Sequence, residues 1–183
     1  MKRLLVLGSP GAGKTTLSFK LHQHFGYRVR HLDAYYFHPG WQVRDKDEWH
    51  KILLEFLGED FWILDGQSNF LELRVAHADT IIYIDTSRWR CFFRVFRRAY
   101  LYRKKNRPDR PEGCPEIVSR DLLKYIWSWP EKRKKMFSLF YNVACQKTVY
   151  ILKDDQEISD FITNLKNPVL LEKYLFQNRP HIF

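Results

Sequence analysis

The chain has 183 residues, and its 45% hydrophobic and 16% aromatic content excludes an intrinsically disordered protein and fits one globular domain. Its formal net charge is +10, and between Arg88 and Lys135 sixteen Lys or Arg stand against five Asp or Glu, which is typical of proteins that bind phosphates. The three cysteines lack CxxC spacing, which predicts reduced thiols in a cytoplasmic protein and no disulfide framework. No apolar run approaches ~18 residues, so we expect no membrane partner.

The predicted elements alternate between strands and helices along the chain. The predicted strands cover residues 2–7, 27–33, 61–65, 80–85 and 148–152. The predicted helices cover residues 15–25, about 47–57, 88–102, 117–129, 130–142 and 155–165. Gly26 ends the first helix, Asp45 or Asp47 caps the second, and Pro130 suits the first turn of the fifth. We expect loops over residues 34–44, 67–79 (with a short helix) and 103–115, and we assign no structure after Asn167.

This alternation predicts an α/β fold, with a parallel sheet covered by helices on both faces. In such a sheet the active site lies at the carboxyl ends of the strands. Gly8 follows directly after the first predicted strand, and the second, third and fourth predicted strands end in Asp33, Asp65 and Asp85. The sequence therefore predicts that phosphate-binding backbone and carboxylates meet at one edge of the sheet.

The segment after the first strand matches the phosphate-loop pattern GxxxxGK[ST] in full. Its small residues let backbone N–H groups surround a polyphosphate, and the following helix adds the positive end of its dipole. Lys14 can reach the β- and γ-phosphates of ATP, and the Thr15 hydroxyl can bind Mg²⁺. The predicted ATP site consists of Gly8, Ser9, Pro10, Gly11, Ala12, Gly13, Lys14, Thr15 and Thr16.

Each of the three aspartates after strands has a predicted role and an alternative. Asp65 follows an apolar run and could hold Mg²⁺ together with Thr15, or it could close an Asp-Gly turn. Asp33 could orient or deprotonate an acceptor hydroxyl, or it could cap a local turn. Asp85 is better explained as the cap of the helix that follows it.

The predicted helix over residues 88–102 is strongly basic. Its basic residues recur at helical spacing, at Arg90, Arg94, Arg97 and Arg98, with Arg103 just beyond it. Arg94 and Arg98 lie four residues apart on one face and could neutralise a transferring phosphoryl group. The expected buried side comprises Trp89, Phe92, Phe93, Val95 and Phe96. The flap over 103–110 could close over the nucleotide, although a solvated basic helix and loop would show the same composition.

With these pieces in place, the chain resembles the adenylate-kinase-related P-loop proteins, and most closely the DNA topology modulation family. The segments that carry this are LVLGSPGAGKTTLSFKL, HLDAYYFHPGW, WILDGQSNF and RPDRPEGCPEIVSRDLLKYIWSWPEKR. The resemblance implies a nucleoside-monophosphate-kinase-like, three-layer core with a five-stranded sheet in the order 2-3-1-4-5, binding ATP and Mg²⁺. It covers residues 1–165, with a short basic lid at about 103–117, and leaves 166–183 as a tail.

The resemblance also assigns individual residues. Asp65 with Gly66 matches the Asp-Gly pair after the third strand of adenylate kinases, and Arg94 and Arg98 match the two arginines before the lid. Arg107 and Arg110 fall in the lid region. Where adenylate kinases continue with Phe-Pro-Arg, this chain has Gln67-Ser68-Asn69, so the acceptor stays open.

The leading hypothesis is an ATP-binding phosphotransferase that converts ATP to ADP by moving the γ-phosphate to a small acceptor, such as a nucleotide or nucleoside. Its catalytic residues would be Lys14, Asp33, Arg94 and Arg98, with the acceptor near Asp33, Trp41 and Asn69. The alternative is a nucleotide-dependent DNA-binding regulator, whose basic segment would grip the DNA backbone. An ATPase without an acceptor is a third hypothesis.

Overall fold

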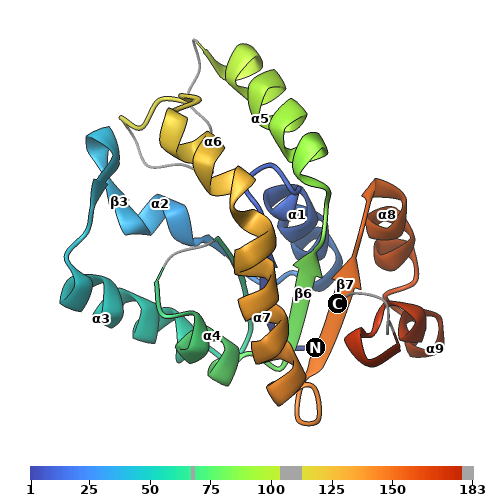
Figure 1. Ribbon diagram of the computed structural model, residues 1–183. Coiled ribbons are helices and arrows are strands. Elements are labelled where there is room, and N and C mark those ends of the chain that lie inside the picture. The colour runs from blue at the N-terminus through green and yellow to red at the C-terminus, as the bar shows by residue number, and fades with distance from the viewer. Residues whose placement is uncertain (67–68, 104–112, 179–183) are drawn as a thin grey trace.

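A computed structural model describes residues 1–66, 69–103 and 113–178, and its centre is a five-stranded parallel sheet (Figure 1). The strands are β1 (Arg3–Gly8), β2 (Val29–His31), β5 (Trp62–Asp65), β6 (Thr80–Ile84) and β7 (Thr148–Leu152). They lie in the order β2-β5-β1-β6-β7, and every neighbouring pair is parallel. Numbered along the chain, this is 2-3-1-4-5, so the expected α/β fold and sheet order are confirmed.

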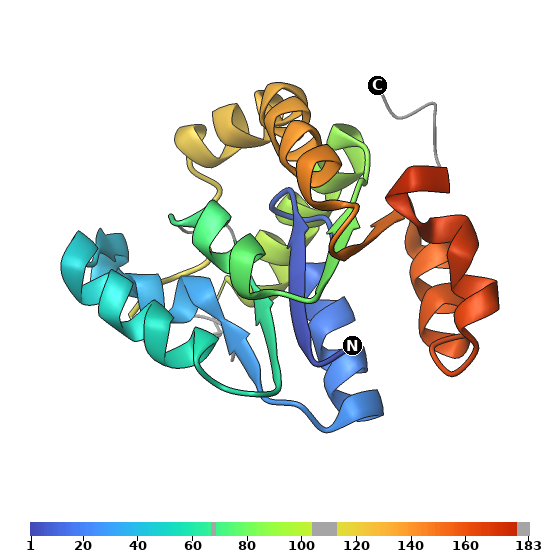
Figure 2. The same ribbon diagram turned by 90° about the horizontal axis from the view of Figure 1, so that it is seen from below.

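Helices cover both faces of the sheet, as Figures 1 and 2 show from two directions. The helices are α1 (Lys14–Phe25), α2 (Leu32–Tyr36), α3 (Lys46–Leu57), α4 (Leu71–His77), α5 (Arg88–Tyr102), α6 (Arg120–Trp127), α7 (Trp129–Val143), α8 (Asp155–Thr163) and α9 (Pro168–Leu171). Alternate residues of β1 enter the two cores: Leu5 joins residues of α3, α4 and α7, and Leu4 joins residues of α1, α5 and α8. This two-sided burial explains why β1 and β6 are almost entirely apolar.

Local signals set several element ends as predicted. Asp45 caps α3, because its carboxylate accepts the backbone N–H groups of Asp47 and Glu48. Gly26 ends α1 in the left-handed region at φ 73°, and Pro130 lies in the first turn of α7. These ends depend on sequence neighbours alone, so a single sequence can predict them.

The expected loop over residues 34–44 is wrong, and the strand before it is shorter than predicted. After β2 the chain forms α2, and then a small hairpin in which a 3-10 turn joins its two strands. The hairpin consists of β3 (Phe37–His38), η1 (Pro39–Trp41) and β4 (Gln42–Val43). Tyr35 and Tyr36 pack against the core, and Arg44 donates to the carbonyl of Tyr35 at 2.8 Å. Tertiary packing therefore orders a segment whose Pro-Gly pair indicated only a turn.

The predicted capping role of Asp85 is also wrong. The side chain of Ser87 caps α5 by accepting the N–H of Arg90. Asp85 instead pairs with Arg133 of α7, which donates to both carboxylate oxygens at 2.8 and 2.9 Å. This pair joins the end of β6 to a helix 48 residues further along the chain, a contact that no local pattern encodes.

The expected buried side of α5 is wrong in most of its residues. Cys91 and Val95 are buried, but Trp89, Phe93 and Phe96 are 64%, 69% and 52% exposed. The reason lies in the phosphate loop, which packs against the inner face of α5. A Cβ added to Gly11 would lie 2.6 Å from the carbonyl oxygen of Cys91, so this face admits only small side chains.

The end of the described chain packs onto the core. After α9 come the 3-10 turns η2 (Glu172–Tyr174) and η3 (Phe176–Asn178). Leu171, Tyr174 and Phe176 are buried, and Leu175 makes an antiparallel bridge with Tyr150 of β7. Within the described part of the chain, no helix combines the length and apolar character that crossing a membrane requires.

Candidate active site at the carboxyl edge of the sheet

The segment between β1 and α1 forms a tight loop that three glycines make possible. Gly8, Gly11 and Gly13 have φ values of 148°, 82° and 107°, which L side chains rarely adopt. Added Cβ atoms on Gly8 and Gly11 would also lie 2.8 and 2.6 Å from carbonyl oxygens of β6 and α5. The N–H of Ala12 donates to the carbonyl of Ser9 at 3.0 Å, which closes the turn. Glycine is therefore needed here for backbone angle and for space.

The loop opens directly into the first turn of α1. Gly13 occupies the cap position and, as a glycine, has no side chain that could accept hydrogen bonds from the first N–H groups. The positive end of the helix dipole therefore meets the phosphate loop. Thr15 and Thr16 lie in this first turn, next to Lys14.

Lys14 places its ammonium group inside the loop. Its Nζ donates to the carbonyl oxygens of Gly8 at 2.9 Å and Ser9 at 3.1 Å. Burial lowers the pKa of Lys14, and the negative charges of Asp33 and Asp65 oppose this shift. The charges of Asp33, just after β2, and Asp65, at the end of β5, therefore act on the ammonium group beside the loop.

Asp65 ends β5 and is held by a histidine that sequence reasoning did not identify. The register of β2 against β5 pairs His31 with Asp65. The Nδ1 atom of His31 lies 2.9 and 3.0 Å from the two carboxylate oxygens of Asp65, whose side chain is 6% exposed. This contact fixes the direction of the carboxylate at the sheet edge.

Asp33 lies in α2, two residues beyond the end of β2, and still reaches the same edge. A Cβ added to Gly66 would lie 3.0 Å from Oδ1 of Asp33, so the turn after Asp65 passes directly beside this carboxylate. Arg74 of α4 is fully buried and donates to the carbonyl of Gly66 at 3.1 Å. Burial lowers the pKa of Arg74 to about 10, against the opposing charge of Asp33, so Arg74 stays cationic at neutral pH.

The structure places the two predicted arginines of α5 differently. Arg94 lies beside the phosphate loop, where it donates to the carbonyls of Gly11 at 3.4 Å and Ala12 at 3.0 Å and pairs with Asp155 at 2.5 Å. Arg98 donates to Glu116 at 2.8 Å, and the side chain of Glu116 is only 1% exposed. The charge of Arg98 still contributes to lowering the pKa of Lys14, so both arginines face the loop side of α5.

The residues predicted near the acceptor lie around the small hairpin. Asn69 donates to the hydroxyl of Tyr36 at 2.9 Å, and Trp41 donates to the carbonyl of Pro115 at 3.3 Å. Trp41 has a φ of 63°, a strained angle for a side chain of this size. The hairpin also receives a backbone contact, because Gly40 donates to the carbonyl of Gly113 at 3.1 Å. The predicted flap residues Arg107 and Arg110, and Gln67 and Ser68, lie outside the described residues.

Three site residues escaped the sequence analysis: His31, Arg74 and Glu116. His31 stands two residues before Asp33, but its contact with Asp65 depends on the register between β2 and β5. Arg74 lies in a segment predicted only as a loop with a short helix. A buried Arg or Glu gives no signal of its own in a single sequence, because both are usually exposed.

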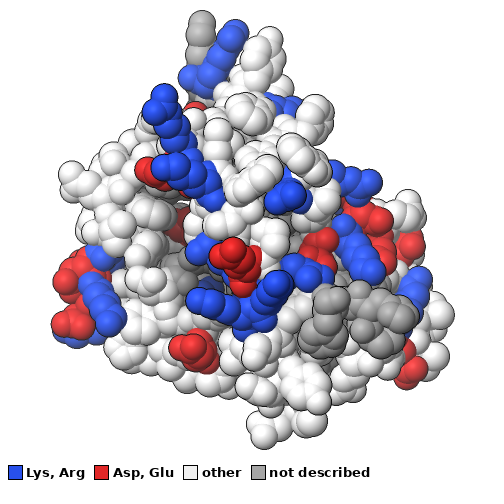
Figure 3. All heavy atoms as spheres, in the orientation of Figure 1, with Lys and Arg blue, Asp and Glu red and all other residues white. Residues whose placement is uncertain are grey.

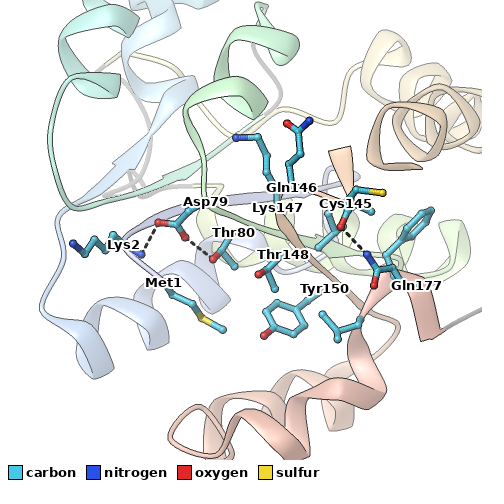
Figure 4. Close-up of a pocket in the computed structure, with 14 residues that line it drawn as sticks. Met1, Lys2, Asp79, Thr80, Cys145, Gln146, Lys147, Thr148, Tyr150 and Gln177 are labelled. Atoms are coloured by element: carbon cyan, nitrogen blue, oxygen red, sulfur yellow. Dashed lines mark hydrogen bonds between the residues drawn. The ribbon is translucent and has the colours of Figure 1, made fainter. Parts of the chain in front are cut away.

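A large open cavity lies at the opposite, amino edge of the sheet (Figure 4). Its volume is about 700 Å³, and its lining includes Lys2, Asp79, Thr80, Lys147 and Gln177. Two charged side chains of the cavity are hydrogen-bonded to backbone groups. Asp79 accepts hydrogen bonds from the N–H groups of Lys2 and Arg3, both at 2.8 Å. Lys147 donates hydrogen bonds to the carbonyls of Ala76 and Ala78. None of the predicted site residues lines this cavity.

The fold has known counterparts, although no family model matches the sequence and no curated protein does. The chain is similar to a shikimate kinase from Bacteroides thetaiotaomicron, with 18% identity over 92% of this chain and 98% of the other and a TM-score of 0.55. Two structures of a deoxyadenosine kinase from M. mycoides also match. The structure with dCMP and dCDP has 13% identity over 91% of this chain and 97% of the other, with a TM-score of 0.50. The structure with dCTP has 14% identity over 90% of this chain and 98% of the other, with a TM-score of 0.47. The protein therefore has the α/β fold of P-loop kinases.

Proposed function

We propose that the protein is an ATP-dependent phosphotransferase with the phosphate loop as its ATP site. The observation that carries this proposal is the convergence of the loop, Lys14 and the carboxylates of Asp33 and Asp65 at one sheet edge. Backbone N–H groups and Lys14 would bind the β- and γ-phosphates, and transfer would depend on positioning and charge neutralisation. The likeness to solved kinases supports the fold on which this chemistry depends.

Mg²⁺ would be held by the Thr15 hydroxyl and by Asp65, directly or through water. Hydroxyl and carboxylate oxygens are the donors that Mg²⁺ prefers, and phosphate oxygens complete its coordination. When bound, the ion would neutralise charge that develops on the transferring phosphoryl group. His31 already fixes the Asp65 carboxylate, which would reduce the ordering cost of binding the ion.

The acceptor would present a hydroxyl to Asp33, which would orient it or take its proton. Arg94 would neutralise phosphate charge from beside the loop, and Arg98 would do so on exchanging Glu116 for phosphate. We place the acceptor between Asp33, Trp41 and Asn69. A nucleoside, a nucleotide or a small hydroxy acid fits this scheme, and the solved kinases with similar folds act on deoxyadenosine and shikimate, which both carry hydroxyl groups.

The finer family assignment, to the DNA topology modulation proteins, is also a proposal. It is supported by the four segments that carry the resemblance and by the confirmed sheet order. The assignment describes a relationship and leaves the acceptor to experiment.

The direct test is a screen of nucleosides, nucleotides and small hydroxy acids with Mg²⁺ and ATP. We expect at least one acceptor to raise ADP release well above the background of Lys14→Ala. Equal ADP release with and without every acceptor, but above that background, would indicate an ATPase. No release above the background would contradict the proposal.

DNA binding is the weaker candidate. Three cations of the basic segment, Arg94, Arg98 and Arg133, are engaged by Asp155, Glu116 and Asp85, so the charge available to a DNA backbone is smaller than the sequence suggests. Micromolar duplex binding near 0.15 M salt, falling with a log–log slope of about −0.9 per phosphate contacted, would favour it instead.

A further inference from the structure

Helix α5 differs from an ordinary surface helix, because it exposes large aromatic side chains in addition to its buried Cys91 and Val95. Arg94 and Arg98 point toward the phosphate loop and Glu116, whereas Phe93 and Phe96 point to solvent and are 69% and 52% exposed. A surface helix normally buries its apolar stripe and exposes its charges. The function of the inner face accounts for the arginines, but nothing in the phosphotransferase scheme uses the outer face.

The outer face of α5 carries a continuous apolar stripe. Trp89, Phe93, Phe96 and Tyr100 recur at spacings of four, three and four residues, and each is more than half exposed. Trp127 of α6 widens the stripe, because its ring lies 6.0 Å from that of Trp89 and it is 53% exposed. We call these five residues the α5 outer face. Exposed patches of this kind mark interaction surfaces.

The charged side chains of α5 itself all have one sign. Residues 88–103 contain no Asp or Glu, and Arg90, Arg97 and Arg103 are exposed along the stripe. The guanidinium of Arg88 lies 4.2 Å from the ring of Trp127 and 5.7 Å from that of Trp89, so its charge sits on the aromatic surface. In Figure 3 the region over α5 and α6 is white and blue with little red. Charge complementarity therefore favours an anionic occupant of this face.

We propose that the α5 outer face docks on an anionic membrane surface. Trp, Tyr and Phe with flanking arginines are the side chains that settle at the headgroup boundary, where rings enter the acyl region and guanidinium groups meet lipid phosphates. A second copy of the chain fits less well, because antiparallel packing of two such helices would place Arg90 against Arg97 of the other copy. Single-stranded nucleic acid would also stack on the rings, and the test below distinguishes it from a membrane. The contact is peripheral and does not rest on the phosphotransferase proposal.

The test is co-sedimentation with vesicles of phosphatidylcholine alone, or of equal parts phosphatidylcholine and phosphatidylglycerol. We expect wild type to bind the anionic vesicles at least about tenfold more tightly than the neutral ones in about 0.1 M salt. Binding should weaken in about 1 M salt, where the Debye length is about 3 Å. The paired change Phe93→Ser with Phe96→Ser should weaken binding at least about tenfold. Its matched control is Phe19→Ser with Tyr141→Ser, two aromatics 57% and 70% exposed on other helices, which should change nothing.

A second pair of variants isolates the charge. Arg90→Gln with Arg97→Gln should weaken anionic-vesicle binding by roughly thirtyfold, whereas Lys51→Gln with Lys166→Gln, equally exposed but on other elements, should have little effect. All these side chains are exposed, so thermal unfolding should be unchanged. Equal affinity for both vesicles, or equal losses in the variants and their controls, would overturn the proposal. A dimer seen in sedimentation equilibrium that the Phe93 and Phe96 changes abolish would also overturn the proposal. Binding of oligothymidylate that the same changes abolish would overturn it as well.

Discussion

The two edges of the central sheet differ in what their polar groups do. At the carboxyl edge, Lys14, Asp33 and Asp65 come from three different segments and act on one another electrostatically. At the amino edge, Asp79 and Lys147 line a cavity of about 700 Å³ but bond to backbone N–H and carbonyl groups. The first set holds charges in place for a ligand, and the second joins strand ends to their neighbours. A cavity by itself is therefore not evidence of a ligand site.

The two edges also differ in how strongly their backbone conformation requires glycine. The carboxyl edge has backbone that only glycine tolerates, at Gly8 and Gly11. At the amino edge Gly26 also has a positive φ of 73°, but a Cβ added there would meet nothing within 4 Å. Strained backbone persists where surrounding structure over-determines it, and it gathers at sites of function. Matched substitutions at the two edges therefore separate chemistry from stability.

The largest expected effect is that of Lys14→Ala. Because Lys14 would bind the phosphates that carry the developing charge, ATP turnover should fall roughly 10³-fold. Lys147→Ala at the amino edge is the control, and its turnover per folded molecule should match wild type. Steady-state ADP release measures both. Equal losses in the two variants would remove the distinction between the edges.

Asp33→Asn should lower kcat by roughly 10²-fold with the best acceptor, because the amide cannot accept the hydroxyl proton. The matched change Asp79→Asn should leave kcat unchanged. A normal kcat in Asp33→Asn would show that Asp33 acts as a turn residue, the alternative that its position in the sequence also allowed.

His31→Ala should raise the Mg²⁺ concentration for half-maximal activity about 10- to 100-fold, because Asp65 would lose the group that orients it. His31→Asn retains a donor near the same position and should recover part of this loss. His22→Ala, an exposed histidine of α1, is the control. If all three variants bind Mg²⁺ equally well, His31 is not a positioning residue.

The smallest effect concerns stability at the amino edge. Burial alone would raise the pKa of Asp79, but hydrogen bonds from Thr80 and from the N–H groups of Arg3 and Lys2 lower it on balance. A lowered pKa contributes stability above the ordinary carboxyl range, and this contribution is lost as the pH falls through the folded-state value. Asp79→Asn should therefore reduce the free energy of unfolding by about 1 kcal/mol at pH 7. Denaturant titrations should show the difference in unfolding free energy between wild type and Asp79→Asn disappearing below about pH 4. A difference that stays constant with pH would contradict this assignment.

Local patterns made most of the fold predictable from the sequence. The apolar run before Gly8, the caps at Asp45 and Gly26 and the periodicity of residues 88–102 depend on neighbours within one or two turns. The expectation that active sites lie at the carboxyl ends of parallel strands then predicted that Lys14 and the two aspartates meet at one edge. Sequence alone could not give the His31–Asp65 contact, which depends on the register of β2 and β5.

The orientation of α5 shows a second limit. Two stripes of this helix have helical spacing, and the aromatic one looked like the core side. The close approach of Gly11 reserves the inner face for Cys91 and Val95, and it leaves Phe93 outside. The partners of Asp85 and Arg98 likewise lie on other elements, at Arg133 and Glu116. Such contacts are decided by tertiary packing.

The central claim is that backbone amides and Lys14 at the start of α1 form a polyphosphate site. Titration calorimetry with Mg²⁺ and ATP tests it most directly, with Lys14→Ala and Lys147→Ala alongside wild type. We expect wild type and Lys147→Ala to bind ATP with the same affinity, and Lys14→Ala to bind at least about tenfold more weakly. No heat of binding in folded wild type, or equal affinity in all three proteins, would contradict the account.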